Sequence, residues 1–263
     1  MIYLSNHKGL RPIYNFLVTN DDGILSEAID LLARSLMPFG HVTVIAPTAN
    51  RSGVGHSITA LDAMRLKKMH SENRLDMYAC TGMPADCIKI GIDALMPEKP
   101  DFIFSGINLG TNTGQAIFSS GTMAAAREAC YRGFPAFALS AVRQADRTIN
   151  LAMLSELLPL MIPRLLDFPL AQDSFLNINL PACDLDQIKG YKCASMNPKN
   201  LLFNAEQATD ARGRQIFWLN KVHKDLEQEE VLIQEGYIVV TPIELPTWDE
   251  TKFGAIEEWL NRE

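Results

Sequence analysis

The chain has 263 residues, of which 47% are hydrophobic, so it can bury the core of one large domain. Its formal net charge of −7 argues against a surface that holds long nucleic acids, because such surfaces carry a basic stripe. No apolar run approaches the roughly 18 to 20 residues of a membrane-spanning helix. The five cysteines are an odd number and form no C-x-x-C pair, which indicates buried thiols in a reducing compartment rather than disulfides or a zinc site. We therefore expect a cytoplasmic protein whose partners are neither nucleic acid polymers nor membranes.

Short apolar runs alternate with helical patterns over the first two thirds of the chain. The runs typical of buried strands cover residues 16–19, 41–46, 75–80, 101–105 and 135–140. Helical patterns follow Ser26, a suitable N-cap, and Pro84, a suitable first helical residue, and a third covers residues 122–132. This repeated order predicts an α/β fold over residues 14–180: a doubly wound, mostly parallel, Rossmann-like sheet with helices on both faces.

The pattern changes after about residue 180. Residues 189–222 are polar and irregular, with a strand-like piece at 216–219, and a further strand is expected at 236–240. Residues 249–262 have the spacing of an amphipathic helix, with Phe253, Ile256 and Leu260 on one side. We therefore predict a smaller, hairpin-rich C-terminal subdomain with a terminal helix over residues 181–263.

Four predicted strands end in loops of unusual composition, namely residues 20–23, 47–53, 81–86 and 105–114. Ligands bind beyond the carboxyl ends of the strands in an open parallel sheet, so we expect these loops to converge. Asp21 and Asp22 directly follow an apolar strand, and adjacent carboxylates repel each other unless a cation lies beside them. Asn-Asp-Asp-Gly is also good turn sequence, so an ordinary polar turn is the alternative. The oxygen donors of these loops favour Mg²⁺, Mn²⁺ or Ca²⁺ over Zn²⁺.

A glycine-rich loop over residues 106–121 leads into an alanine-rich helix through Ser119, Ser120, Gly121 and Thr122. Free N–H groups and hydroxyls at a helix N-terminus form a natural seat for phosphate. The alternative is simple N-capping of the helix by Ser or Thr.

Familiar nucleotide and esterase signatures are absent from the sequence. It contains no G-x-x-x-x-G-K-[ST] loop, no G-x-G-x-x-G after the first strand and no G-x-S-x-G elbow. His56 is interpreted as a structural or substrate-edge residue rather than a catalytic base. Arg51 is interpreted as a solvent-facing residue or a support for a phosphate or metal loop.

Taken together, the loop sequences resemble those of the SurE family, the stationary-phase survival proteins that act as 5′/3′-nucleotidases. The matching segments, in order, are LVTNDDG (17–23), AP with NRSG (46–53), TG with PADC (81–87), PD with SGIN (100–108), SGT (120–122), GFPA (133–136) and GYIVVTP (236–242). A single such motif is weak, but the ordered set over residues 16–140 is specific. Residues 1–13 precede the first of these motifs.

The resemblance implies a metal-dependent phosphomonoesterase that hydrolyses nucleoside 5′-monophosphates, and in some members 3′-monophosphates. It implies one divalent ion per subunit, Mg²⁺ or Mn²⁺ foremost with Ca²⁺ open, bound by Asp21, Asp22, Ser52 and Asn108. It places Asn112, Ser120, Gly121 and Thr122 at the phosphate and substrate site. Asp21 is the expected catalytic residue, which orients or deprotonates the attacking water. The family also forms homodimers or homotetramers through a protruding hairpin and an exchanged C-terminal helix.

The chain departs from the family pattern at four positions, with Met83 for a usual threonine, Gln115 and Ala116 for acidic residues, and Ser119 for a tyrosine. The four expected metal ligands are intact, so the nucleotidase expectation stands. The alternatives are a nucleotide-binding protein without hydrolytic activity, a broad phosphatase or exopolyphosphatase, and a transferase that uses the aspartate pair as a metal clamp.

Overall fold

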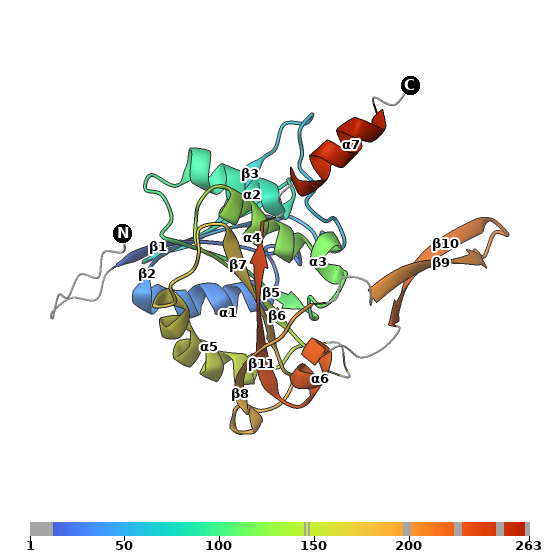
Figure 1. The fold of residues 1–263 in the computed structure, drawn as a ribbon. Helices are drawn as coiled ribbons and strands as arrows, with labels where there is room; N and C mark the ends of the chain where they lie inside the picture. The colour runs from blue at the N-terminus through green and yellow to red at the C-terminus, as the bar shows by residue number, and fades with distance from the viewer. Residues whose placement is uncertain are drawn as a thin grey trace.

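A computed structural model describes residues 13–144, 146, 148–196, 201–223, 228–245 and 250–260 (Figure 1). Its centre is a nine-stranded sheet in the order β3-β4-β2-β1-β5-β6-β7-β11-β8. The strands are β1 (Tyr14–Thr19), β2 (Gly40–Pro47), β3 (Leu66–Glu72), β4 (Leu75–Cys80), β5 (Phe102–Leu109), β6 (Ala136–Ala141), β7 (Ser174–Leu180), β8 (Gly190–Cys193) and β11 (Tyr237–Glu244). The six neighbouring strands β4, β2, β1, β5, β6 and β7 run parallel to one another. At either side of this block, β3 pairs antiparallel with β4 and β11 pairs antiparallel with β7. The predicted α/β fold with a mostly parallel sheet is confirmed.

The sheet has its topological switch point between β1 and β5. The chain leaves β1 for β2 and β4 on one side, then returns to β5 on the other side, where Thr19 is in register with Ser105. The connections diverge at this point, so a crevice opens beyond the carboxyl ends of these two strands. The aspartate pair follows β1, and Asn108 lies near the end of β5.

Helices cover both faces of the sheet (Figure 1). Alternate residues of β1 point to opposite faces: Phe16 and Val18 join the cluster under α1 (Glu27–Leu36) and α5 (Leu151–Leu166). Leu17 joins the cluster under α2 (Pro84–Ile90) and α4 (Gly121–Tyr131). As predicted, Ser26 is the N-cap of α1 and Pro84 the first residue of α2. The predicted apolar face of α1, which consists of Ile29, Leu32, Ala33 and Leu36, is buried.

Short helical segments complete the connections. They are the 3-10 turns η1 (Met37–Phe39), η3 (Leu185–Gln187) and η4 (Glu250–Lys252), the π-helical turn η2 (Gly91–Leu95) and the single turn α3 (Ala116–Ser119). No helix in the described ranges has the length and apolar character needed to cross a membrane. All five cysteines are free thiols, but only three of them are buried as predicted, since Cys183 is half-buried and Cys193 is exposed.

Several features differ from the sequence prediction, which also gave no helix at α5 and no strand at β7 or β8. The glycine-rich loop does not begin at Gly106, because β5 continues to Leu109. Gly106 has φ +135°, and an added Cβ would stand 2.3 Å from the Leu139 carbonyl oxygen on β6. Only glycine fits this close approach, so here the glycine belongs to a strand rather than a connector. The edge strand β3 was not predicted, because its residues are polar and largely exposed and carry no apolar alternation.

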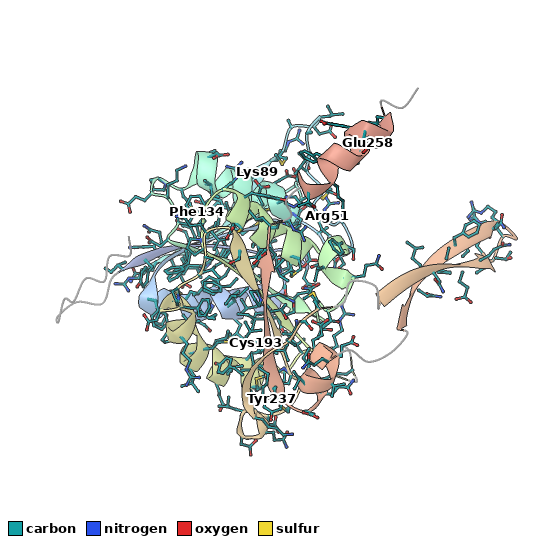
Figure 2. All side chains as sticks on the ribbon, in the orientation of Figure 1. Arg51, Lys89, Phe134, Cys193, Tyr237 and Glu258 are labelled. Atoms are coloured by element: carbon teal, nitrogen blue, oxygen red, sulfur yellow. The ribbon has the colours of Figure 1, made fainter. Side chains whose placement is uncertain are left out.

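The C-terminal third supplies both sheet strands and a separate hairpin. Strands β9 (Leu201–Thr209) and β10 (Gln215–His223) form their own antiparallel sheet, which extends away from the main body in Figure 1. Strands β8 and β11 instead pair with each other in the main sheet, and Figure 2 shows Cys193 and Tyr237 there, at the end remote from Lys89. Helices α6 (Gln228–Gln234) and α7 (Phe253–Leu260) follow the hairpin and β11. The division at residue 180 stays a prediction, and residues 249 and 261–262 of the expected terminal helix lie outside the described residues.

Candidate metal and phosphate site

A cavity of about 600 Å³ lies beyond the carboxyl ends of β1 and β5. Five of the predicted site residues line it, namely Asp21, Ser52, Asn108, Asn112 and Ser120. Three of the four predicted loops therefore converge on this cavity, whereas no residue of the fourth, 81–86, lines it. Asp22 lines a neighbouring cavity of about 410 Å³, and Leu109 borders both spaces. Gly121 and Thr122 lie behind Asp21 and do not line either cavity.

Asp21 is held in a fixed orientation by the N-terminus of α4. Its side chain is almost fully buried, and its Oδ1 accepts a hydrogen bond of 2.6 Å from the Thr122 hydroxyl. Burial raises the pKa of Asp21 above its ordinary value, while hydrogen bonds from Thr122 and from the backbone of Thr122 and Gly121 oppose that rise. An added Cβ at Gly121 would stand 2.7 Å from the Asp21 Cβ, so glycine permits this close approach. Gly121 and Thr122 thus contact the aspartate rather than the cavity.

Asp22 points to the other side of the turn. Its Oδ2 accepts a hydrogen bond of 3.1 Å from the Leu109 N–H. Burial and then the negative charge of Asp21 raise the pKa of Asp22 to about 6, against opposing effects of the Leu109 N–H and Arg143. The turn itself is made by Asn20, whose side chain bonds both the N–H and the carbonyl of Gly23 at 3.0 and 3.1 Å. Neither aspartate is needed for the turn, so the turn alternative leaves both carboxylates unexplained.

Ser52 and Asn108 add oxygen atoms that can bind a cation to the larger cavity, the one that Asp21 lines. The Asn108 Nδ2 donates to the Gly110 carbonyl at 2.7 Å, so its amide oxygen is the atom available to a cation. The Ser52 N–H donates to the Asn50 side chain at 2.7 Å, which fixes the loop that presents the Ser52 hydroxyl. Two carboxylates, a hydroxyl and an amide oxygen fit a hard divalent cation. The described residues contain no cluster of three or more His, Cys, Asp or Glu side chains suited to a metal.

Asn112 is anchored by two strands of the sheet. Its Nδ2 donates to the Ser140 hydroxyl at 2.8 Å, and its N–H donates to the Asn179 side chain at 2.9 Å. The Asn112 carbonyl accepts from Asn177 Nδ2 at 2.8 Å. The next residues of the loop are held by α6, because the Gly114 N–H donates to the buried Glu229 at 2.6 Å. Asn177, Asn179 and Glu229 were not predicted from the sequence, although two asparagines within the mostly apolar run SFLNINL (174–180) are a usable signal.

The Ser120 side chain is both an N-cap and a cavity wall. Its Oγ accepts a hydrogen bond of 3.2 Å from the Met123 N–H, so the N-cap interpretation of this residue is confirmed. Two of the departures from the family pattern, Ala116 and Ser119, line the cavity beside it. Met83 instead lies at the start of α2, where its N–H donates to Asp86 at 2.9 Å.

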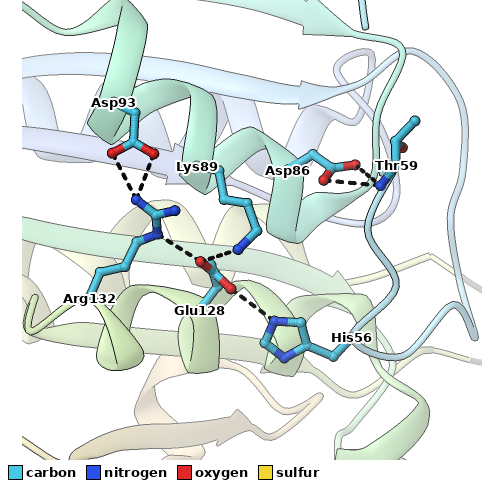
Figure 3. Close-up of polar contacts among 7 residues, drawn as sticks. All are labelled: His56, Thr59, Asp86, Lys89, Asp93, Glu128 and Arg132. Atoms are coloured by element: carbon cyan, nitrogen blue, oxygen red, sulfur yellow. Dashed lines mark hydrogen bonds and ion pairs between the residues drawn. The ribbon is translucent and has the colours of Figure 1, made fainter. Parts of the chain in front are cut away.

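His56 belongs to a separate polar network (Figure 3). Its Nε2 lies 3.1 Å from Glu128, which also accepts hydrogen bonds from Lys89 at 2.5 Å and Arg132 at 2.7 Å. Burial raises the pKa of Glu128, but these three partners together lower it to about 2. Because His56 does not line the cavity, the structure favours a structural role for it.

Arg51 supports the aspartate loop through its backbone. Its N–H donates to the Asp21 carbonyl at 2.7 Å, and its side chain reaches the Thr81 carbonyl at 3.4 Å. Arg51 does not line the cavity, so its contacts support the loop that contains Asp21 from outside the cavity (Figure 2).

Comparisons with known proteins identify the family to which this chain belongs. The family model described as "Survival protein SurE" matches residues 16–201. The 5′-nucleotidase SurE of Thermoanaerobacter sp. (strain X514) is 36% identical over 248 residues, which cover 92% of this chain and 97% of that protein. The 5′/3′-nucleotidase SurE of Yersinia enterocolitica is 34% identical and covers 93% and 96% of the two chains. The crystal structure of the SurE protein from Aquifex aeolicus superimposes with a TM-score of 0.79 at 29% identity, covering 94% of this chain and 100% of that one. The chain therefore belongs to the SurE family.

Proposed function

We propose that this protein is a metal-dependent 5′-nucleotidase that hydrolyses nucleoside monophosphates to nucleoside and phosphate. The observation that carries this proposal is the pair Asp21 and Asp22 at the switch point of the sheet, beside the oxygen donors of Ser52 and Asn108. Relatives that match more than nine tenths of the chain are named 5′-nucleotidase SurE, and one is named 5′/3′-nucleotidase SurE. Activity on 3′-monophosphates is part of the proposal for that reason.

A divalent ion would be held by Asp21, Asp22, Ser52 and Asn108. Such an ion would act as a Lewis acid that polarises a phosphoryl oxygen and lowers the pKa of water. Mg²⁺ or Mn²⁺ fits this oxygen donor set best, and Ca²⁺ fits it as well. The metal requirement is part of the proposal, supported by the donor chemistry of these four side chains.

The residues of the chain then take three roles according to what they contact. Asp21 orients the attacking water and accepts its proton as the water oxygen bonds to phosphorus and the bond from phosphorus to the nucleoside oxygen breaks; this proton then passes to the nucleoside oxygen, which leaves as a hydroxyl group. Thr122 and Gly121 act as positioning residues, because they contact the Asp21 carboxylate. Asn112 and Ser120 line the cavity beside Asp21 and contact the phosphate.

We further propose a cytoplasmic homodimer or homotetramer. Apolar side chains are exposed on the two C-terminal elements that extend from the main body, namely Phe217, Trp218 and Leu219 on β10 and Phe253, Ile256 and Leu260 on α7. Contiguous exposed apolar groups of this kind are typical of protein interfaces. Light scattering during size exclusion measures the mass directly, and a mass near the 29.3 kDa of one chain would exclude this proposal.

The decisive experiment measures phosphate release from 5′-AMP with Mg²⁺, with Mn²⁺ and with EDTA. We expect metal-dependent release that EDTA abolishes and that Asp21→Asn lowers by about 10² to 10³ fold, the range seen for loss of one preorganised catalytic group. Asp76→Asn is the matched control, because Asp76 pairs with Lys68 on the remote edge of the sheet and its loss should leave the rate unchanged.

The alternatives predict different results in the same assay. AMP binding without release under every metal would favour a nucleotide-binding protein, and the altered cavity residues Ala116 and Ser119 would then be its cause. Faster release from polyphosphate than from AMP would indicate an exopolyphosphatase. Product formation only with an added acceptor would indicate a transferase.

A further inference from the structure

The cavity has a second half that the proposed chemistry does not use. Its phosphate half contains Asp21 and the polar residues beside it. The other half is formed by the residues that follow β6 and by one side of α6, namely Val142, Arg143, Glu230, Ile233 and Gln234. A volume of about 600 Å³ is that of a site for a whole small organic ligand rather than for a phosphate ion alone.

Arg143 is fixed at the edge of this second half. Its Nε donates a hydrogen bond of 2.6 Å to the Leu109 carbonyl. The guanidinium lies against Gly110, where an added Cβ would stand 3.5 Å from Nε and 4.0 Å from Cζ. A planar cation anchored in this way is suited to stack on an aromatic ring, and it loses little side-chain entropy when it does so.

Apolar and polar groups surround this cation. Val142 packs against the small buried cluster that contains Ile233, and both side chains line the cavity, where they form an apolar wall. Gln234 at the end of α6 is exposed and offers both a donor and an acceptor. Glu230 is placed at the rim by a hydrogen bond of 3.2 Å from the Thr113 hydroxyl. An apolar wall, a flat cation and edge-on hydrogen-bonding groups match a nucleobase with its ribose.

We propose that Arg143, Val142, Ile233 and Gln234 form the subsite for the nucleoside, so that the enzyme selects nucleotides over simple phosphate esters. Arg143 would stack on the base, and Gln234 would bond its edge or the ribose. This inference rests on the proposed nucleotidase function, and it adds which part of the substrate is recognised and where.

The neighbouring cavity is the competing location for the nucleoside. It is smaller, at about 410 Å³, and the charged residues that line it are Asp22 and Glu27, both acidic. It has apolar residues such as Leu25 and Ile149 but no lining cation, and Leu109 separates it from the cavity that contains Asn112 and Ser120. The larger cavity is continuous with these residues, so it accommodates both halves of one nucleotide.

The test compares kcat/KM for AMP, ribose 5-phosphate and glycerol 3-phosphate in the full-length protein with saturating metal. We expect Arg143→Ala to lower the ratio of kcat/KM for AMP to that for glycerol 3-phosphate by about tenfold, the size of a desolvated cation–π contact. Inhibition by adenosine should weaken by a similar factor. Arg164→Ala is the matched control, because Arg164 is on α5 and its guanidinium lies over the ring of Tyr191. This variant should leave the ratio unchanged.

Two results would overturn the subsite while leaving the nucleotidase function intact. An equal fall for all three esters would mean that Arg143 serves the phosphate or the Leu109 segment. A fall in the AMP ratio for Leu25→Ala but not for Arg143→Ala would place the nucleoside in the neighbouring cavity. If no ester is hydrolysed, the proposed function fails separately, and the subsite is still decided by calorimetry of AMP binding, which Arg143→Ala must weaken.

Discussion

Replacing Gly121 with alanine is the sharpest test of how Asp21 is positioned. Gly121 begins α4, and an added Cβ would stand 2.7 Å from the Asp21 Cβ, 3.0 Å from the Pro84 Cγ and 3.1 Å from the Asp21 Oδ2. Ordinary van der Waals contacts begin at 3.4 Å, so the Asp21 Cβ must retreat by about 0.7 Å. Side-chain rotation cannot relieve this contact, because a Cβ atom is fixed to its own backbone.

The expected effect on stability is modest, and the expected effect on activity is large. Overpacking of a buried contact costs about 1–3 kcal/mol of unfolding free energy. The higher helix propensity of alanine offsets up to about 1 kcal/mol of this. Activity is more sensitive, because a displacement of about 1 Å at a catalytic group costs on the order of 100-fold in rate. We therefore expect Gly121→Ala to remain folded and to lose about two orders of magnitude in kcat/KM for AMP.

Thermal unfolding and AMP hydrolysis at saturating Mg²⁺ or Mn²⁺ measure the two effects on the same preparation. Gly254→Ala in α7 is the matched control, because an added Cβ there meets nothing within 4 Å. It should keep full activity and equal or higher stability. Wild-type activity in Gly121→Ala would refute the argument that contact with the helix start positions Asp21.

Two further variants test contacts at and near α4. Thr122→Val removes the hydroxyl that donates to Asp21 at 2.6 Å, so we expect a loss of about 1–3 kcal/mol in unfolding free energy together with a fall in kcat/KM. Thr241→Val removes another buried, bonded hydroxyl and should lower stability alone, so equal activity of the two variants would contradict this role. Glu128→Gln tests the network of Figure 3: the folded-state pKa of about 2 lies below the ordinary 4.5, so the ionised carboxylate stabilises the fold above pH 4.5 and this contribution is lost as pH falls through 2. Between pH 4.5 and 2 the wild-type protein should therefore lose up to about 3 kcal/mol more unfolding free energy than Glu128→Gln, and its melting temperature should fall more steeply. Parallel curves of melting temperature against pH would show that the network contributes nothing.

The five parallel strands β1, β2, β4, β5 and β6 and the edge of the sheet that holds the cavity were predictable from the sequence for one physical reason. Strands buried on both faces appear as continuous apolar runs, and the polar loops that end them must lie at one edge of a parallel sheet. Asp21, Ser52 and Asn108 come from three of the segments that were predicted as loops, and all three line one cavity. The resemblance to the SurE family added their expected roles, which the apolar pattern alone does not indicate.

What the sequence could not supply is the direction in which each side chain points. Thr122 was expected at the phosphate, but its hydroxyl donates to Asp21. The two adjacent aspartates line two different cavities. Asn179 accepts a hydrogen bond from the Asn112 N–H and Glu229 accepts one from the Gly114 N–H. These partners are 67 and 115 residues apart in the sequence, so no local pattern connects them. Such long-range contacts depend on how β7 and α6 pack, which composition and periodicity do not encode.

The charges around Asp21 give an electrostatic argument for the proposed metal ion. The α4 N-terminus and Thr122 offset part of the cost of burying the Asp21 carboxylate. A phosphate monoester would bring further negative charge against Asp21 and beside Asp22, while Arg143 is the basic residue among those that line the cavity. One guanidinium at the rim does not neutralise two carboxylates and a dianion, so phosphate binding requires an additional positive charge between them. A divalent ion bound by the oxygen atoms of Ser52 and Asn108 would meet this requirement, so the charge balance of the site supports the proposed metal dependence.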